Sequence, residues 1–94
     1  MAKKIVWSPR SAHNLEDICE FISKDSPRYA SVFARGIINI IERTSQNPEI
    51  GRVVPEFGNN ELRERIFGSY RIIYRVSNIA IEIVTIVHGS RLVK

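Results

Sequence analysis

The spacing of apolar residues changes at Pro48, and this change constrains the fold more than any other feature of the sequence. Before Pro48, apolar residues recur every three or four positions, which is the spacing of an amphipathic helix. After it, closely spaced runs rich in Ile, Val and Tyr are typical of β-strands. A helical half followed by a strand-rich half predicts an α+β fold, in which helices cover one face of a sheet.

The N-terminal half predicts a short strand at residues 3–7 and then two helices. Ser8-Pro9 and Ser26-Pro27 each signal a helix start, because serine accepts hydrogen bonds from free backbone N–H groups and proline suits the first helical position. The first helix should end near Ser23. The second should end at Asn47-Pro48, because the residue before a proline disfavours helical geometry. Only three or four residues would join the two helices, and so short a link predicts an antiparallel helical hairpin.

The C-terminal half predicts a loop followed by an antiparallel meander. Residues 49–60 are mostly loop, with room for a short strand at Arg52–Val54. Three strands should follow at roughly 61–67, 70–76 and 79–87, joined by two-residue turns at Gly68-Ser69 and Ser77-Asn78. Residues 1–94 therefore predict one domain, with a short N-terminal strand and a two-helix antiparallel hairpin packed on a mostly antiparallel β-sheet.

The two turns set which side chains share a face of this sheet. Phe67 should lie opposite Tyr70 in the first hairpin, and Val76 opposite Ile79 in the second. Because side chains alternate between the faces of a strand, one face should be apolar and lie beneath the helices. Its expected members are Phe67, Tyr70, Ile72, Tyr74, Val76, Ile79, Ile81 and Ile83.

The other face gathers charged side chains and has two interpretations. Its expected members are Glu64, Arg71, Ile73, Arg75, Glu82 and, at the far end, His88. Glu64 and Glu82 should each lie diagonal to Arg71 and Arg75, within reach of long side chains. One interpretation is therefore a solvated face laced with salt bridges, each of which contributes little stability. The other is an open face that holds phosphates, because Arg71 and Arg75 lie on a central strand, where placement is rigid. Arg63 and Arg65 should point toward the rim of the helix side.

The composition indicates which kind of partner and which cellular compartment suit this protein. The net charge is +4, and arginine outnumbers lysine ten to four, which suits a nucleic-acid or acidic-protein partner. Cys19 alone cannot form an internal disulfide, which favours the cytoplasm. No membrane span is expected, because the apolar stretch behind the two N-terminal lysines is only three residues long. No cofactor is expected either, and one cysteine and two distant histidines are a poor ligand set for a metal site.

His88 and Arg91 form a second candidate site near the end of the last strand. A histidine can transfer protons near neutral pH, and an arginine can stabilise the charge that develops on a phosphorane. The alternative interpretation is that His88 is a surface residue that caps the strand.

Long segments of the chain resemble the RelE/ParE toxin superfamily, the toxins of bacterial type II toxin–antitoxin pairs. They read PEIGRVVPEFGNNELRERIFGSYRIIYRV and IAIEIVTIVHGSR, and WSPRSAHNLEDICEFI is similar to the N-terminal half of the family. The resemblance covers nearly the whole chain. It implies the same two-helix fold and a toxin that is neutralised by a cognate antitoxin, within a possible toxin–antitoxin hetero-oligomer.

The superfamily divides by target: RelE-like members cleave mRNA on the ribosome, and ParE-like members poison DNA gyrase. The resemblance implies that a RelE-like enzyme would use Arg71, His88 and Arg91 as catalytic residues. Such enzymes also use lysines at positions where this chain has Leu62 and Glu64, and they carry a tyrosine after the final arginine, which residues 92–94 lack. The segments LRE, YRIIY and HGSR look more like the ParE branch.

We therefore expect a toxin that arrests growth by inhibiting DNA gyrase. Its target- or phosphate-binding residues would be Arg52, Glu64, Arg71 and Arg75. The alternative is a ribosome-dependent mRNA endonuclease, so the sequence leaves the status of the protein as an enzyme open. A non-toxic basic module that binds nucleic acid is a further alternative, because it needs only the arginine-rich face.

Overall fold

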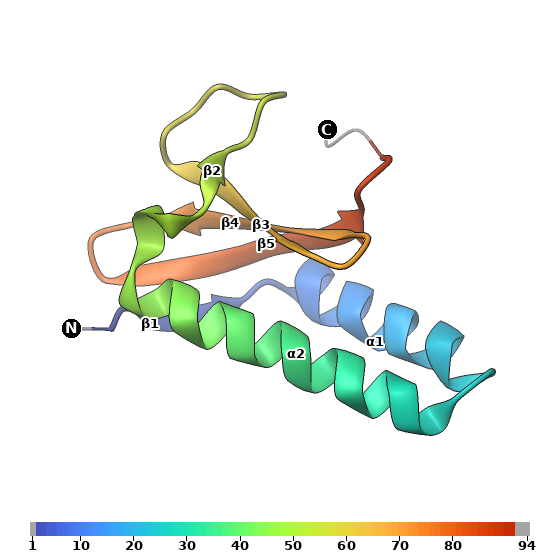
Figure 1. The fold of residues 1–94 in the computed structure, drawn as a ribbon. Helices are drawn as coiled ribbons and strands as arrows, with labels where there is room; N and C mark the ends of the chain where they lie inside the picture. Colours follow the sequence, from blue (N-terminus) through green and yellow to red (C-terminus); the bar gives the residue numbers. More distant parts are fainter. Residues whose placement is uncertain (1, 92–94) are drawn as a thin grey trace.

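A computed structural model of the chain describes residues 2–91 and consists of two layers. Two helices cover one face of a five-stranded sheet, and a long loop stands over the other face (Figure 1). This arrangement confirms the predicted α+β class. The elements are β1 (Lys4–Trp7), α1 (Pro9–Ser23), α2 (Pro27–Gln46), the 3-10 helix η1 (Pro48–Ile50), β2 (Arg52–Val53), β3 (Leu62–Phe67), β4 (Tyr70–Val76) and β5 (Ala80–His88).

Both helices begin where the Ser-Pro pairs predicted. The Ser8 hydroxyl accepts a hydrogen bond from the backbone N–H of Ser11 at 3.0 Å, and Ser26 does the same for Tyr29 at 3.1 Å. Ser8 also donates to the carbonyl oxygen of Val84 at 2.9 Å. The cap that starts α1 therefore also attaches this helix to β5.

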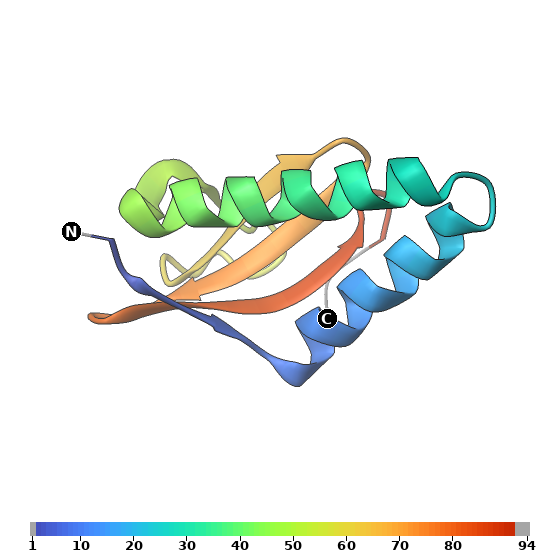
Figure 2. The ribbon, with the colours of Figure 1, turned by 90° about the horizontal axis from the view of Figure 1, so that it is seen from below.

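The strand order is β1-β5-β4-β3-β2, with β1 parallel to β5 and the other pairs antiparallel. Figure 2 shows β1 crossing alongside β5 before the chain turns into α1. β1 ends at Trp7, so the edge of β5 beyond that point needs other partners. The Asn14 side chain supplies one, because its Oδ1 accepts from the Ile86 N–H at 3.1 Å and from the Thr85 hydroxyl at 2.7 Å.

The core lies between the helices and the sheet, as expected. Apart from Ile79, every predicted member of the apolar sheet face belongs to the core or packs against it. Phe33 of α2 joins the layers through edge-to-face contacts with Phe67 and Tyr70, at centroid distances of 5.5 and 5.3 Å.

The register of the first hairpin confirms the prediction, since Phe67 pairs with Tyr70 and Glu64 with Ile73. The second hairpin differs. Its turn is centred on Asn78-Ile79, because the Ser77 N–H donates to the Ala80 carbonyl oxygen at 2.9 Å. The partner of Val76 is therefore Ile81. A shift of two residues keeps each side chain on its face, but it places Ile79 in the turn, 77% exposed.

A register irregularity in the β4–β5 pairing overturns the predicted position of His88. Tyr74 pairs with Ile83 but Ile73 pairs with Thr85, so Val84 is an extra residue in β5. An extra residue reverses the alternation of side chains beyond it. His88 consequently lies opposite Tyr70, with ring centroids 5.6 Å apart. The prediction that His88 shares a face with Arg71 was wrong.

Tyr74 connects the core to η1 and provides a test of the fold. Its buried hydroxyl donates to the Pro48 carbonyl oxygen at 2.6 Å and accepts from the Gly51 N–H at 3.0 Å. Tyr74→Phe leaves both groups without this partner, and we expect it to lower the free energy of unfolding by about 1–3 kcal/mol. Urea denaturation of both proteins at pH 7 measures the difference.

The same substitution should change the dependence of stability on alkaline pH. Burial raises the pKa of Tyr74 above its ordinary value, and the hydrogen bond from Gly51 only partly opposes this. A raised folded-state pKa contributes stability that is fully present below about pH 10, the unfolded value, and is lost as the pH rises through the folded value. Between pH 9 and about pH 11, wild-type stability should fall more steeply than that of Tyr74→Phe; parallel curves would contradict this assignment.

Candidate functional site

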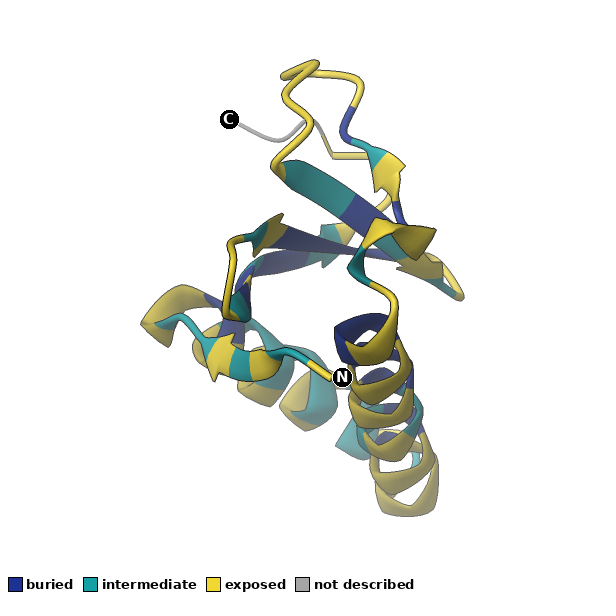
Figure 3. Cartoon of the chain, turned by 90° about the vertical axis from the view of Figure 1, so that its left-hand side faces the viewer, coloured by how far each residue is buried: buried dark blue, intermediate teal, exposed yellow. Residues whose placement is uncertain are grey.

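The central part of the sheet face opposite the helices is covered, which corrects both interpretations drawn from the sequence for that part of the face. Ile73 points to this face and is 1% exposed, and Val54, at the start of the long loop, is fully buried. Figure 3 shows that the loop above the sheet is itself largely exposed. Around Arg71 and Ile73 the face is therefore neither a solvated surface nor an open platform, and residues 54–61 form its cover there. Toward Arg75 and Glu82 the face is exposed.

Four charged residues meet beneath this cover, and we call them the Arg–Glu cluster: Arg52, Glu56, Glu64 and Arg71. Glu64 is at the centre, with its side chain fully buried. One of its carboxylate oxygens accepts from Arg71 Nε at 2.6 Å, and the other accepts from Arg52 Nε. Glu64 therefore bridges the two arginines, and the predicted Glu64–Arg71 contact is confirmed.

Arg71 uses its remaining donors on the loop and the C-terminal segment. Its Nη1 and Nη2 donate to the two carboxylate oxygens of Glu56 at 2.7 and 2.8 Å, and Nη1 also donates to the Arg91 carbonyl oxygen at 3.2 Å. The hydrogen bond to Glu56 is the main cause that raises the pKa of Arg71, and it outweighs burial, which lowers it. Arg71 is thus a fixed cation with its charge balanced by two carboxylates.

The other expected binding residues are distributed differently. Arg52 belongs to the cluster, although its side chain is 64% exposed. Arg75 is exposed and lies outside the cluster, opposite Leu62 on β3 and Glu82 on β5. The structure thus brings together Arg52, Glu64 and Arg71, with Arg75 further along the same strand.

Glu56 is the cluster member that sequence reasoning did not assign to a site. It lies in a loop without hydrophobic periodicity, so no face could be predicted for it. Arg63 and Arg65 lie at the rim of the helix side, as expected. Arg63 Nη1 donates to the Gly51 carbonyl oxygen at 2.9 Å, and Arg65 Nη1 to the Thr44 hydroxyl at 3.0 Å.

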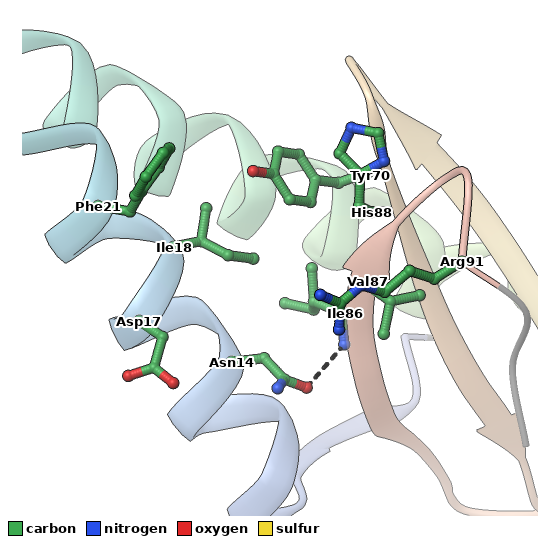
Figure 4. Close-up of a pocket in the computed structure, with 9 residues that line it drawn as sticks. All are labelled: Asn14, Asp17, Ile18, Phe21, Tyr70, Ile86, Val87, His88 and Arg91. Carbon is green, nitrogen blue, oxygen red and sulfur yellow. Dashed lines mark hydrogen bonds between the residues drawn. The ribbon is translucent and has the colours of Figure 1, made fainter.

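On the helix side, a cavity of about 360 Å³ opens between α1 and the ends of β4 and β5 (Figure 4). Its lining comprises Asn14, Asp17, Ile18, Phe21, Tyr70, Ile86, Val87, His88 and Arg91. His88 hydrogen-bonds through Nδ1 to the Ser90 hydroxyl at 2.8 Å. His88 and Arg91 therefore share one cavity, whereas Arg71 lies on the opposite face of the sheet, so the side chains of this expected catalytic set are not assembled around one point.

A second hollow of about 290 Å³ continues this cavity toward the helical hairpin. The two share Phe21 and Tyr70, and we call them together the aromatic groove. Its second part is lined by Phe21, Ile22, Tyr29, Phe33, Phe67, Gly68, Ser69 and Tyr70. Phe21 and Tyr29 are 69% and 59% exposed, so large aromatic surfaces face solvent at this end of the molecule.

Residues 2–91 contain neither a metal-binding cluster nor a helix that could cross a membrane. His, Cys, Asp and Glu side chains do not gather there in any group of three that could hold a metal ion. Within the same residues, each helix is too short or too polar to cross a membrane.

Comparisons with known proteins give a family for the sequence and solved structures with a similar fold. Residues 5–93 match the family model described as the ParE toxin of the type II toxin–antitoxin system parDE. The fold is similar to a structure titled as the chromosomal ParDE toxin–antitoxin system from P. aeruginosa, with a TM-score of 0.76 and 18% identity over 93% of this chain and 96% of that chain.

It is also similar to a structure titled as a RelBE toxin–antitoxin complex from Mycobacterium tuberculosis, with a TM-score of 0.62 and 17% identity over 94% of this chain and 99% of that chain. A search of curated protein sequences found no match. The family match spans almost the entire chain, and the protein therefore belongs to the ParE family of type II toxin–antitoxin toxins.

Proposed function

We propose that this protein arrests bacterial growth by binding and inhibiting DNA gyrase, and that it does not cleave RNA. The observation that carries the proposal is that Arg71 and His88, which a nuclease of this family would need at one phosphate, lie on opposite faces of the sheet. A nuclease needs donors aimed at the charge that develops on the scissile phosphate. Every nitrogen of the Arg71 guanidinium instead donates to Glu56 or Glu64.

The positions of the neighbouring residues support the same choice. His88 lies on the helix side of the sheet, so it cannot transfer a proton at a phosphate that Arg71 holds on the other side. The Arg–Glu cluster contains two arginines and two glutamates, so its formal charge is zero. A neutral cluster in which the central Glu64 and Arg71 are buried suits a structural role beneath a binding surface better than the neutralisation of a transition state.

The test is to induce the protein in bacteria and to examine both candidate targets. We expect growth arrest, intact mRNA in primer-extension assays, and loss of supercoiling by purified gyrase. His88→Ala should keep both arrest and gyrase inhibition, whereas in a nuclease the loss of one such group typically costs on the order of 10²–10³ in rate. Codon-positioned mRNA cuts with unaffected gyrase would establish the RelE-like alternative. Normal growth with abundant folded protein would contradict a toxin and favour the remaining alternative, a non-toxic module that binds nucleic acid.

We further infer that a cognate antitoxin neutralises the protein in the cytoplasm and covers the aromatic groove. The similar structures from P. aeruginosa and M. tuberculosis are of toxin–antitoxin systems. Exposed aromatic surface of this kind is typical of protein interfaces. The groove has Asp17 on one wall and His88 and Arg91 on the other. An apolar segment with an acidic end, docked with that end toward Arg91, would complement it.

Phe21→Glu should therefore weaken antitoxin binding by about 30-fold, which corresponds to the loss of one central aromatic contact. Isothermal titration of the toxin variant with purified antitoxin measures the change. Ile38→Glu is a matched control, since Ile38 is 44% exposed on α2 and does not line the groove. Equal affinities of the two variants would show that the antitoxin binds elsewhere.

A further inference from the structure

The two carboxylates that hold Arg71 differ in how firmly they are placed. Glu64 belongs to β3, its side chain is fully buried, and both of its oxygens are bonded to arginines. Glu56 lies in the covering loop, where residues 55–60 are exposed (Figure 3). Its side chain is 19% exposed, compared with 7% for Arg71. Glu64 therefore cannot leave Arg71 without opening the sheet, whereas Glu56 can leave with the loop.

Backbone hydrogen bonds to the sheet hold the two ends of this loop. The Val54 N–H donates to the Leu62 carbonyl oxygen, and the Leu62 N–H donates to the Asn59 carbonyl oxygen. In the middle of the loop, the N–H groups of Phe57 and Gly58 donate to the Val54 carbonyl oxygen, within the loop itself. The two-point contact of Glu56 with Arg71 joins this middle part to the central strand β4.

The geometry of this contact is the one by which arginine recognises carboxylate or phosphate groups in other molecules, with two parallel N–H donors on two oxygens. When Glu56 moves away, two arginines and one glutamate stay in the cluster. The local formal charge becomes +1, and the N–H groups of Nη1 and Nη2 that Glu56 had occupied become open, while Nη1 keeps its hydrogen bond to the Arg91 carbonyl oxygen. We propose that the Nη edge of Arg71 is a binding site for a carboxylate of a protein partner, and that Glu56 occupies it as an internal, displaceable ligand.

The surroundings favour an acidic side chain of a protein over a nucleic-acid backbone. The opened site carries one net charge, whereas binding of a phosphate backbone depends on several cations along its path. Ile66 lies directly across from Arg71 on the same face and is 52% exposed, and Phe57, beside Glu56, is 43% exposed. A partner segment with a glutamate or aspartate between apolar residues fits these neighbours. This site stands whether or not gyrase is the target.

The test compares Glu56→Gln with Glu61→Gln, which removes the same charge from the same loop away from Arg71. The probes are the peptide acetyl-Leu-Glu-Leu-amide, its glutamine counterpart and hexathymidylate, each titrated into the purified protein while the arginine Nε–Hε signals are followed by NMR. The glutamate peptide should shift the Arg71 signal and bind Glu56→Gln about tenfold more tightly than wild type or Glu61→Gln, because the competing internal carboxylate is gone. Equal affinity of Glu56→Gln and Glu61→Gln for the glutamate peptide would overturn the proposal. Preferential binding of hexathymidylate would show that the site takes a nucleic acid and not a protein.

A second measurement uses the wild-type protein and so does not depend on the folding of a variant. The glutamate peptide, at concentrations that saturate its binding, should speed proteolytic cleavage within residues 55–60, because it displaces Glu56 and releases the loop. The glutamine peptide should leave the cleavage rate unchanged. Cleavage that the glutamate peptide does not accelerate would show that Glu56 is not displaced, and it would overturn the proposal.

Discussion

Replacement of Glu64 by alanine is expected to lower the free energy of unfolding by about 3–5 kcal/mol, the cost of removing one partner from a buried ion pair. Glu64 is the only carboxylate in the described part of the chain that bridges two arginines, Arg52 and Arg71. Without it, the buried Nε of Arg71 loses its acceptor. Arg52 is less affected, because water reaches its exposed side chain.

Urea denaturation at pH 7 measures this loss, with Glu61→Ala as the control for removal of an exposed carboxylate. The double variant Arg71→Met with Glu64→Leu should be more stable than Glu64→Ala alone, since it removes the buried charges together and fills their space. Glu56 and Arg52 then face solvent from the loop and from the edge strand β2. A Glu64→Ala protein within about 1 kcal/mol of wild type would show that the cluster contributes little to stability.

The parts of the fold that were predictable have local causes. The Ser-Pro pairs and the helical spacing placed α1 and α2, because capping and amphipathicity act over a few neighbouring residues. The first hairpin followed from Gly68, whose φ of +58° is one that glycine adopts readily. The register of β3 and β4, and with it the pairing of Glu64 with Arg71, followed from this turn.

The second hairpin was less predictable because its sequence allows more than one register. Ser77-Asn78 and Asn78-Ile79 both provide a polar residue at the turn, and a hydrogen bond from the Ala80 N–H to the Ser77 hydroxyl accompanies the observed choice. The extra residue Val84 left no signal, since Ile, Val and Thr on either side all favour strands. The predicted location of His88 failed for this reason alone, as one residue reverses all later alternation.

The Arg–Glu cluster was half predictable for a related reason. Contacts within a hairpin follow from its register, so Glu64 and Arg71 could be paired in advance. The contact of Glu56 depends on where a 12-residue-long aperiodic stretch, residues 49–60, folds back over the sheet. Tertiary packing decides that path, and the same path turns an expected open face into a covered one.

Gly51→Ala should be the most damaging of the glycine substitutions in this chain, lowering the free energy of unfolding by about 2–5 kcal/mol. Gly51 is buried, with φ of −76°, so alanine meets no backbone strain there. The added methyl group instead collides with the Tyr74 hydroxyl and lies 2.7 Å from the Glu64 carbonyl oxygen. Neither oxygen can move freely, because the Tyr74 hydroxyl is hydrogen-bonded to the Pro48 carbonyl oxygen and the Glu64 backbone belongs to β3 of the sheet.

Gly36→Ala is the matched comparison, because its methyl group also overlaps an aromatic side chain, that of Phe67. Phe67 is only partly buried at the end of β3, so its ring can swing aside. In addition, alanine in the interior of a helix such as α2 is more favourable than glycine by about 1 kcal/mol. Gly36→Ala should therefore stay within about 1 kcal/mol of wild type in urea denaturation. A larger loss in Gly36→Ala than in Gly51→Ala would mean that Phe67, and not the junction of Gly51, Tyr74 and Glu64, is the rigid point that holds β3 in place.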